Sequence, residues 1–244
     1  MREIVIAYCG PAAVPEEFWT RWNTDPLLIA ALIAMAVLVG RSRGPIAERR
    51  AGWAAVGVMA LVFVSPLCAL SSALFSARVL HHVLLVAAVA PLLALAFPLR
   101  RFGSPPLGVL IGVHAAVMWA WHAPGAYSWG LASVPAYWLM QATLLGSAWL
   151  LWRGILSPTA PAGMAFMALG ATIGQMGLLG ALLVFAPRPL YAEHLASTAA
   201  WGLSPLADQQ LAGLLMWMPA MLPYVAVAIK LAWSGLRDTG AQTS

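Results

Sequence analysis

Long apolar stretches separated by short polar segments dominate the sequence. Seven of them are candidate membrane-spanning helices, at about residues 26–40, 52–70, 78–98, 106–122, 135–151, 162–186 and 208–233. A helix needs about 20 apolar residues to cross the hydrocarbon core of a bilayer. The first stretch is short, and the Trp-rich segment before Asp25-Pro26, a typical helix start, is expected to complete it. The pattern therefore predicts an all-α fold, a polytopic membrane bundle of about seven transmembrane helices.

The composition agrees with this interpretation. Apolar residues make up 62% of the 244 and charged residues only 9%, whereas soluble domains carry about 25% charged residues. The chain therefore has too few charges to coat a water-facing surface, and a lipid bilayer is its expected surrounding. No basic run with interleaved aromatic residues is visible, so nucleic acid is not an expected partner.

Basic residues are distributed unevenly between the predicted loops. In a seven-span chain, the loops after the first, third and fifth spans and the C-terminal tail share one side. Nine of the thirteen Lys and Arg residues fall there: Arg41, Arg43, Arg49, Arg50, Arg100, Arg101, Arg153, Lys230 and Arg237. Cytoplasmic loops carry an excess of basic residues, so the N-terminus is expected outside and the C-terminus inside. The expected divisions are a periplasmic leader with an interfacial segment (1–24), a seven-helix transmembrane domain (25–236) and a cytoplasmic tail (237–244).

Histidines gather on the side opposite to these arginines. His81 and His82 open the third span, His122 ends the fourth, and His194 lies in the loop before the seventh. Histidine is the commonest metal ligand. Consecutive residues on a helix point about 100° apart, so His81 and His82 cannot both face one small site, and one of them is expected to reach water. We therefore predict a metal site at His82 and His122, with His81 and His194 as further candidates.

Structural roles compete with metal binding at each of these positions. The histidine pair could bond loop carbonyls at the membrane surface. His122 stands two residues before Pro124 and could cap the end of its helix. His114 is expected to be a core histidine that bonds across helices. Cys9 and Cys68, expected on the same outer side, could form a disulfide, bind copper or do neither.

Thioethers are a further ligand type that favours Cu(I). Methionines in the fifth and seventh spans offer them, although methionine at helical spacing is more often core filler. These residues are Met140, Met216, Met218 and Met221. Gly170 and Gly174 in the sixth span have the spacing that lets a neighbouring helix approach closely.

A second polar group is expected beside the histidines. Arg78 lies one helical turn before His82 and shares its face, so its charge would oppose a metal ion unless a carboxylate such as Asp208 neutralises it. Asp208 itself has the position of an N-cap for the last span. Gln209 and Gln210 follow it, and an amide inside a span needs hydrogen-bond partners.

The segment from Trp201 to Val225, WGLSPLADQQLAGLLMWMPAMLPYV, resembles the C-terminal signature of the CtaG-type cytochrome c oxidase assembly proteins. The resemblance extends to Trp121-His122-Ala123-Pro124 with Tyr127, to His82 followed by a Pro91-containing helix, and to Trp22 with Asp25-Pro26. It implies a non-enzymatic, multi-pass protein of a bacterial inner membrane that helps to mature a respiratory haem–copper oxidase. Cytochrome c oxidase subunits are then the expected partners, and copper at an outward-facing site is the candidate cofactor.

Two other classes of function fit parts of the pattern. A membrane b-type cytochrome would use His82 and His122 as axial haem ligands, because they are the one pair at matched depth on different predicted helices. A transporter of small solutes or metals would carry charges near the middle of a broken helix, and the sequence has no such helix.

Overall fold

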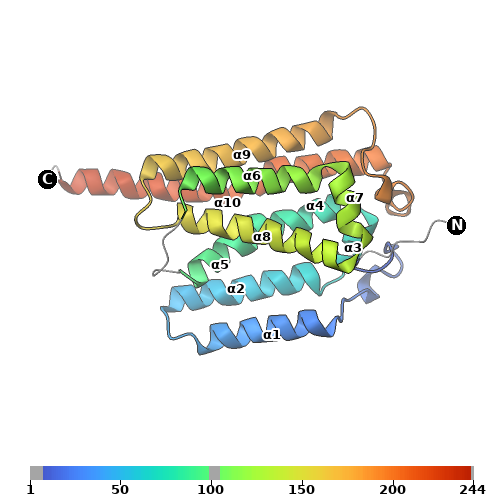
Figure 1. The fold of residues 1–244 in the computed structure, drawn as a ribbon, viewed down its shortest axis with the longest axis horizontal. Coiled ribbons are helices and arrows are strands. Elements are labelled where there is room, and N and C mark those ends of the chain that lie inside the picture. Colours follow the sequence, from blue (N-terminus) through green and yellow to red (C-terminus); the bar gives the residue numbers. More distant parts are fainter. Residues whose placement is uncertain (1–7, 99–104, 243–244) are drawn as a thin grey trace.

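The computed structural model describes residues 8–98 and 105–242, and this part of the chain contains helices and no strands (Figure 1). The predicted all-α fold is therefore confirmed. Residues 1–7 of the predicted leader, Arg100, Arg101 and the last two residues of the predicted tail lie outside the described residues. The helices, in order, are η1 (Phe18–Thr20), α1 (Pro26–Arg41), α2 (Ile46–Phe63), α3 (Leu67–Ala73), α4 (Phe75–Val83), η2 (Leu84–Val89), α5 (Ala90–Ala96), α6 (Leu107–His122), α7 (Pro124–Ala132), α8 (Val134–Ile155), α9 (Ala162–Phe185), η3 (Ala192–His194), η4 (Thr198–Trp201) and α10 (Pro205–Gln242).

Several of these helices are long and apolar enough to cross a membrane. Three qualify alone, namely Phe75–Ala96, α9 and the first 33 residues of α10. Two bent pairs, α2 with α3 (44°) and α6 with α7 (77°), bring the number to as many as five. α1, with 16 residues, is a shorter apolar helix, and α8 occupies the predicted fifth span. The structure is thus compatible with a membrane protein, and the count of seven spans stays a prediction.

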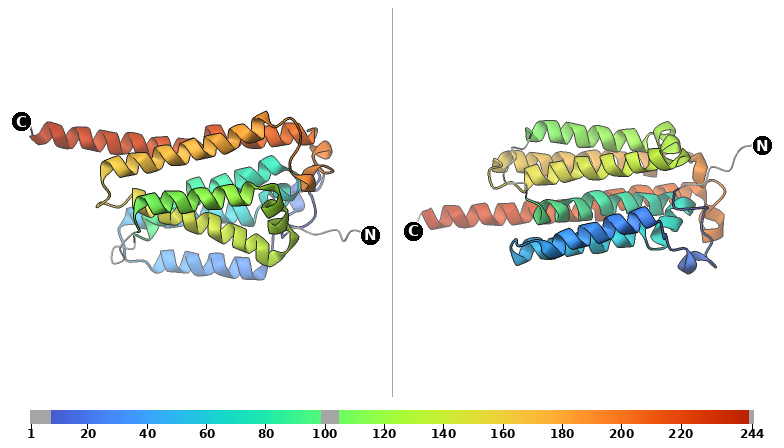
Figure 2. Two further views of the ribbon diagram at one scale, coloured as in Figure 1. Left: turned by 45° about the horizontal axis from the view of Figure 1, so that its top comes forward. Right: turned by 60° about the horizontal axis from the view of Figure 1, so that its bottom comes forward.

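The helices lie side by side, and their connections gather at two ends (Figures 1 and 2). One end, which we call the leader end, holds the segment after residue 7, α3, α7 and the loop with η3 and η4. The opposite end holds the α1–α2 and α8–α9 loops, and α10 extends beyond the bundle there. The sequence predicted this grouping of segments. Which compartment each end faces is not decided by the helices alone.

The helix Phe75–Ala96 is the centre of the bundle. Of the 18-residue apolar stretch that makes this helix a candidate span, 61% is buried, against 39% for the corresponding stretch of α9 and 28% for that of α10. Pro91 has no N–H group and its ring crowds the carbonyl four residues earlier, and the turn before it widens into the π-helix η2. Helices use such bulges to relieve a broken hydrogen-bond ladder. Trp152 of α8 donates its indole N–H to the carbonyl of Val86 (2.9 Å), which anchors the bulge to its neighbour.

Glycines bring α9 and α10 into close contact, but at another place than expected. A Cβ atom added to Gly213 would lie 2.5 Å from the carbonyl oxygen of Gly180, and one added to Gly180 would lie 2.8 Å from that of Gly213. By contrast, nothing lies within 4 Å of a Cβ added to Gly170 or Gly174. The prediction for Gly170 and Gly174 was therefore wrong, because these two glycines are on the exposed side of α9.

A buried histidine pair as the candidate functional site

His82 of α4 and His122 of α6 meet inside the leader end of the bundle. Both side chains are buried, with 2% and 5% of their surfaces exposed, and their ring centroids are 6.0 Å apart. The two residues are 40 positions apart in sequence. The sequence analysis placed them at matched depth, and the structure brings them together.

The hydrogen bonds of His122 leave one nitrogen available. Its Nδ1 lies 2.7 Å from the carbonyl oxygen of Met118, one turn earlier on α6, so Nδ1 carries the proton and donates. Nε2 then has a free lone pair, and no described residue bonds it. Histidines that bind metals usually donate their other ring N–H to a carbonyl or carboxylate in this way. This bond to a carbonyl of the last turn of α6 is also the helix cap that the sequence allowed for His122, so the capping role is confirmed.

Gln141 of α8 gives His82 a similar arrangement. The Gln141 Nε2 atom lies 3.4 Å from His82 Nε2, while Gln141 Oε1 and His82 Nδ1 have no partner among the described residues. The oxygen and nitrogen of an amide can exchange places by a half-turn of the group. With Oε1 facing the ring, His82 Nε2–H donates to it, and the Nδ1 lone pair becomes available. His82 Nδ1 and His122 Nε2 are the two ring nitrogens of this pair that have no partner among the described residues.

His81 does not reach water, contrary to the prediction. Its side chain is fully buried, and its ring packs edge-on against Phe63 of α2 with centroids 4.9 Å apart. Its ring centroid is 5.8 Å from that of His82. Both His81 ring nitrogens lack partners among the described residues. Both imidazoles point into protein, because every residue of α4 except Leu80 is buried.

Arg78, one turn before His82, is fully buried beside the same cluster. Its guanidinium carbon lies 5.4 Å from the ring centroid of Tyr137, and the group also interacts with Tyr127. None of its three nitrogens forms a hydrogen bond of regular geometry within the described part of the chain. A buried cation without a paired anion costs several kcal/mol or more. Asp208, the carboxylate considered as its neutralising partner, bonds Phe75 and Ser76 instead, so the Arg78 charge remains beside the histidines and opposes a metal ion there.

Asp208 caps another helix than the one predicted. It lies in the first turn of α10, but its fully buried carboxylate accepts the backbone N–H groups of Phe75 (2.7 Å) and Ser76 (3.1 Å) and the Ser76 hydroxyl group. These groups form the N-terminus of α4, whose N–H groups have no partners within the helix. The start of α10 itself is capped by Ser204, which accepts from Ala207 N (3.1 Å). Asp208 therefore fixes the helix that carries His82.

The two glutamines after Asp208 hold the end of α9. Gln209 accepts from Leu190 N (2.7 Å) and donates to the Leu183 carbonyl (3.2 Å), and Gln210 donates to the Val184 carbonyl (3.3 Å). The prediction that these amides need partners inside the bundle is confirmed. The Asp-Gln-Gln segment is thus a clamp that joins α10 to α4 on one side and to α9 on the other.

The two other histidines have structural partners. His194 Nε2 bonds the hydroxyl group of Tyr127 at 2.6 Å, and His114 Nδ1 bonds the Ser147 hydroxyl group across to α8 at 3.0 Å. Burial, helped by the charge of Arg78, lowers the pKa of His194 to about 4. His194 is therefore neutral at pH 7, and nothing places it beside His82. The prediction of a core role for His114 is confirmed.

The sulfur atoms that were candidate ligands are used elsewhere. Cys9 and Cys68 form a disulfide with Cα atoms 5.2 Å apart, so their sulfurs are not thiolates that could bind a metal. Met140 and Met216 belong to the apolar core, and Met218 is 59% exposed. In the described residues no group of three or more His, Cys, Asp and Glu side chains could hold a metal ion. The donor set at the site is therefore the two imidazoles.

Sequence reasoning missed two residues of the site. Gln141 orients His82, and Tyr191 donates its hydroxyl group to the carbonyl of His122 (2.7 Å). Tyr191 also stacks on Phe75, with ring centroids 3.8 Å apart. A polar residue in the middle of the fifth span was a signal for Gln141. Nothing in the sequence indicated Tyr191, because it lies in a loop without a recognisable motif.

Comparison with known proteins agrees with the resemblance in the sequence. The family model described as "Cytochrome c oxidase caa3 assembly factor (Caa3_CtaG)" matches residues 30–238. No curated protein and no solved structure matches the chain.

Proposed function

Because the chain belongs to the cytochrome c oxidase caa3 assembly factor family, we propose that it is a non-enzymatic factor that handles copper for a haem–copper oxidase in a bacterial inner membrane. Association with the oxidase follows from the family, whereas the subunit it meets and the copper are part of the proposal. The observation that carries the copper proposal is the buried pair of His82 and His122, each with one orphaned ring nitrogen.

The separation of the two rings supports this proposal. Imidazole nitrogen suits copper, and metal–nitrogen bonds of this kind are about 2.0–2.1 Å long. Two imidazoles on opposite sides of one ion therefore have ring centroids about 6 Å apart, close to the 6.0 Å between His82 and His122. Cu(I) accepts such a pair of donors. The carbonyl of Met118 holds the His122 proton on Nδ1, which leaves the Nε2 lone pair of His122 free. His82 would offer its Nδ1 lone pair when the Gln141 amide turns its oxygen towards Nε2.

The disulfide supports the proposed orientation. Disulfides persist in oxidising compartments, and the cytosol keeps thiols reduced. The Cys9–Cys68 bond lies at the leader end of the bundle. With the leader end outside, as the arginine distribution also indicates, the histidine pair is near the periplasmic surface, where copper would be passed to an oxidase subunit.

The family match does not support the two other functions considered from the sequence. A b-type cytochrome would show a haem absorption band in the purified protein, and a transporter would move solute in vesicles. The family match favours neither.

Complementation of a deletion strain tests the proposed function. We expect the deletion to abolish haem–copper oxidase activity while the oxidase subunits are still produced, and the wild-type gene to restore it. His82→Ala and His122→Ala should fail to restore activity, and His114→Ala, which removes another buried histidine of α6, should restore most of it. Full activity in the deletion strain would contradict the assembly role. Full restoration by His82→Ala and His122→Ala would contradict the copper handling and leave the assembly role standing.

A further inference from the structure

A fixed positive charge lies beside the proposed copper site. Arg78 is fully buried one helical turn before His82 on α4, and it interacts electrostatically with both His81 and His82. Within the described part of the chain it forms no ion pair with a carboxylate and no hydrogen bond of regular geometry. Arginine keeps its charge even in apolar surroundings. An ion held between His82 and His122 is therefore bound next to a cation.

The groups that contact Arg78 stabilise its charge without cancelling it. The guanidinium carbon lies 5.4 Å from the ring centroid of Tyr137, and the face of an aromatic ring attracts a cation. Tyr127 is a second uncharged neighbour, and its hydroxyl group bonds His194 at 2.6 Å. The Asp208 carboxylate accepts from the N–H groups at the start of α4. These neighbours bring no free negative charge, so the charge of Arg78 acts on whatever the histidines bind.

The leader covers this charge at the leader end of the bundle. Tyr8 stacks on Tyr137 with ring centroids 4.8 Å apart, and Tyr137 and Arg78 are both fully buried. Salt screens exposed charges strongly and buried charges much less. The repulsion between Arg78 and an ion at the histidine pair is therefore little weakened by water or salt.

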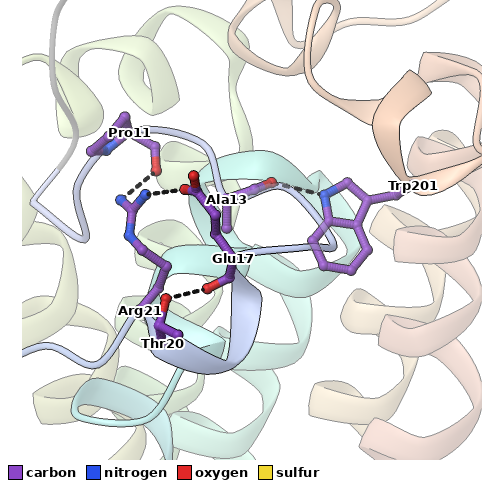
Figure 3. Close-up of polar contacts among 6 residues, drawn as sticks. All are labelled: Pro11, Ala13, Glu17, Thr20, Arg21 and Trp201. Carbon is purple, nitrogen blue, oxygen red and sulfur yellow. Dashed lines mark hydrogen bonds and ion pairs between the residues drawn. The ribbon is translucent and has the colours of Figure 1, made fainter.

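Hydrogen bonds hold the leader in this covering position (Figure 3). Arg21 donates to the carbonyl of Pro11 (3.1 Å) within the leader. Trp201 of η4 donates its indole N–H to the carbonyl of Ala13 (2.9 Å), which ties the leader to the loop before α10. The cover over Arg78 is thus part of the folded protein, and no ligand is needed to form it.

We infer that Arg78 is a specificity-determining residue, which makes the histidine pair select a singly charged ion over a divalent one. This inference rests on the proposed copper function and names the charge of the ion that the site takes. The repulsion between two charges is proportional to their product, so Arg78 opposes a divalent ion twice as strongly as a monovalent ion at the same place. Two neutral imidazoles do not offset that repulsion. The site would therefore receive copper already reduced, as Cu(I), and reject Cu²⁺ and Zn²⁺.

Silver and mercury ions test this inference, because Ag(I) and Hg(II) both favour two donors in a line and differ in charge. The chain has two cysteines and they form a disulfide, so neither ion has a thiol to bind. The purified full-length protein in detergent is titrated with each ion by calorimetry in chloride-free buffer. Binding that His82→Ala and His122→Ala remove belongs to the pair. The measured quantity is the ratio of the Hg(II) affinity to the Ag(I) affinity at the pair.

Arg78→Met should raise this ratio about tenfold or more, because the second unit of ion charge no longer meets the guanidinium group. Arg78→Gln, which removes the charge but keeps a polar side chain, should raise it equally. Tyr137→Phe disturbs the surroundings of Arg78 without removing its charge and should keep the wild-type ratio. Arg153→Met is the matched control, because it removes a cation from the last turn of α8 at the opposite end of the bundle, and it should change neither affinity.

Two kinds of failure can be told apart. An unchanged ratio in both Arg78→Met and Arg78→Gln, with Ag(I) still bound at the pair, would overturn the inference and leave the copper site standing. A ratio that rises as much in Tyr137→Phe as in Arg78→Met would also overturn it, because the effect would then not follow the charge. Ag(I) binding that neither His82→Ala nor His122→Ala reduces would overturn the copper site, and the inference with it.

Discussion

Replacing Asp208 by alanine removes the link between α10 and the helix that carries His82. The carboxylate accepts from Phe75 N, Ser76 N and the Ser76 hydroxyl group, and it is fully buried. Two backbone N–H groups at the start of α4 then lose their partner in a place that water does not readily reach. We expect the variant to be less stable and the position of His82 to be less well fixed.

The magnitude follows from these three hydrogen bonds. Bonds to a charged group contribute about 1.5–3 kcal/mol each, and a buried donor left unsatisfied costs about 1–3 kcal/mol. Partial rehydration of the cavity reduces the sum, so we expect the free energy of unfolding to fall by about 3–5 kcal/mol for Asp208→Ala. Asp208→Asn keeps an acceptor and is a good capping residue, so its loss should be about 1–2 kcal/mol.

Unfolding of the purified protein in detergent, followed by circular dichroism, measures these losses. Ser204→Ala is the matched control, because Ser204 caps α10 itself by accepting from Ala207 N, and loss of an ordinary cap costs about 1 kcal/mol. If Asp208→Ala and Ser204→Ala lower the stability equally, Asp208 is no more than a local residue of α10, and the proposed clamp between α10 and α4 is refuted.

Three further predictions concern other contacts. Gly213→Ala should lower stability by about 1–3 kcal/mol, because its Cβ would lie 2.5 Å from the Gly180 carbonyl oxygen. Gly170→Ala is the control and should leave stability unchanged, because nothing lies within 4 Å of a Cβ added there. Thermal unfolding of the two variants measures the difference. The pKa of His194 is lowered to about 4 by burial and by Arg78, so the folded protein binds fewer protons than the unfolded chain. Stability measured against pH should be full above pH 6.5 and decrease by up to about 3 kcal/mol as pH falls towards 4, and His194→Gln should flatten this slope. Arg78→Met should raise the unfolding temperature, because it removes a buried charge without a paired anion; a clear drop would contradict this reasoning.

The bundle could be predicted from the sequence because its cause is local. Long apolar stretches in a chain with few charges specify helices in a membrane. Asp25 accepts from Leu27 N (2.8 Å) and Leu28 N (3.4 Å) at the start of α1, as predicted, because a cap depends on neighbours in sequence. Matched depth along predicted spans was also enough to pair His82 with His122.

The details of the site could not be predicted because they depend on which helix faces which. Asp208 has the sequence position of a cap for α10, yet it caps α4 more than 130 residues earlier. Gly170 and Gly180 lie in the same glycine-rich helix, and only the direction of each face decides which one touches α10. Sequence alone also left the pairing of Cys9 with Cys68 open, since two sulfurs must come within bonding distance.

Copper titration of the purified protein tests the central claim most directly. We predict that wild type binds one Cu(I) ion, that His82→Ala and His122→Ala each abolish this binding, and that His114→Ala, with a histidine removed from the same helix as His122, binds as wild type does. Unchanged copper stoichiometry in both His82→Ala and His122→Ala would contradict the claim that the buried histidine pair holds the metal.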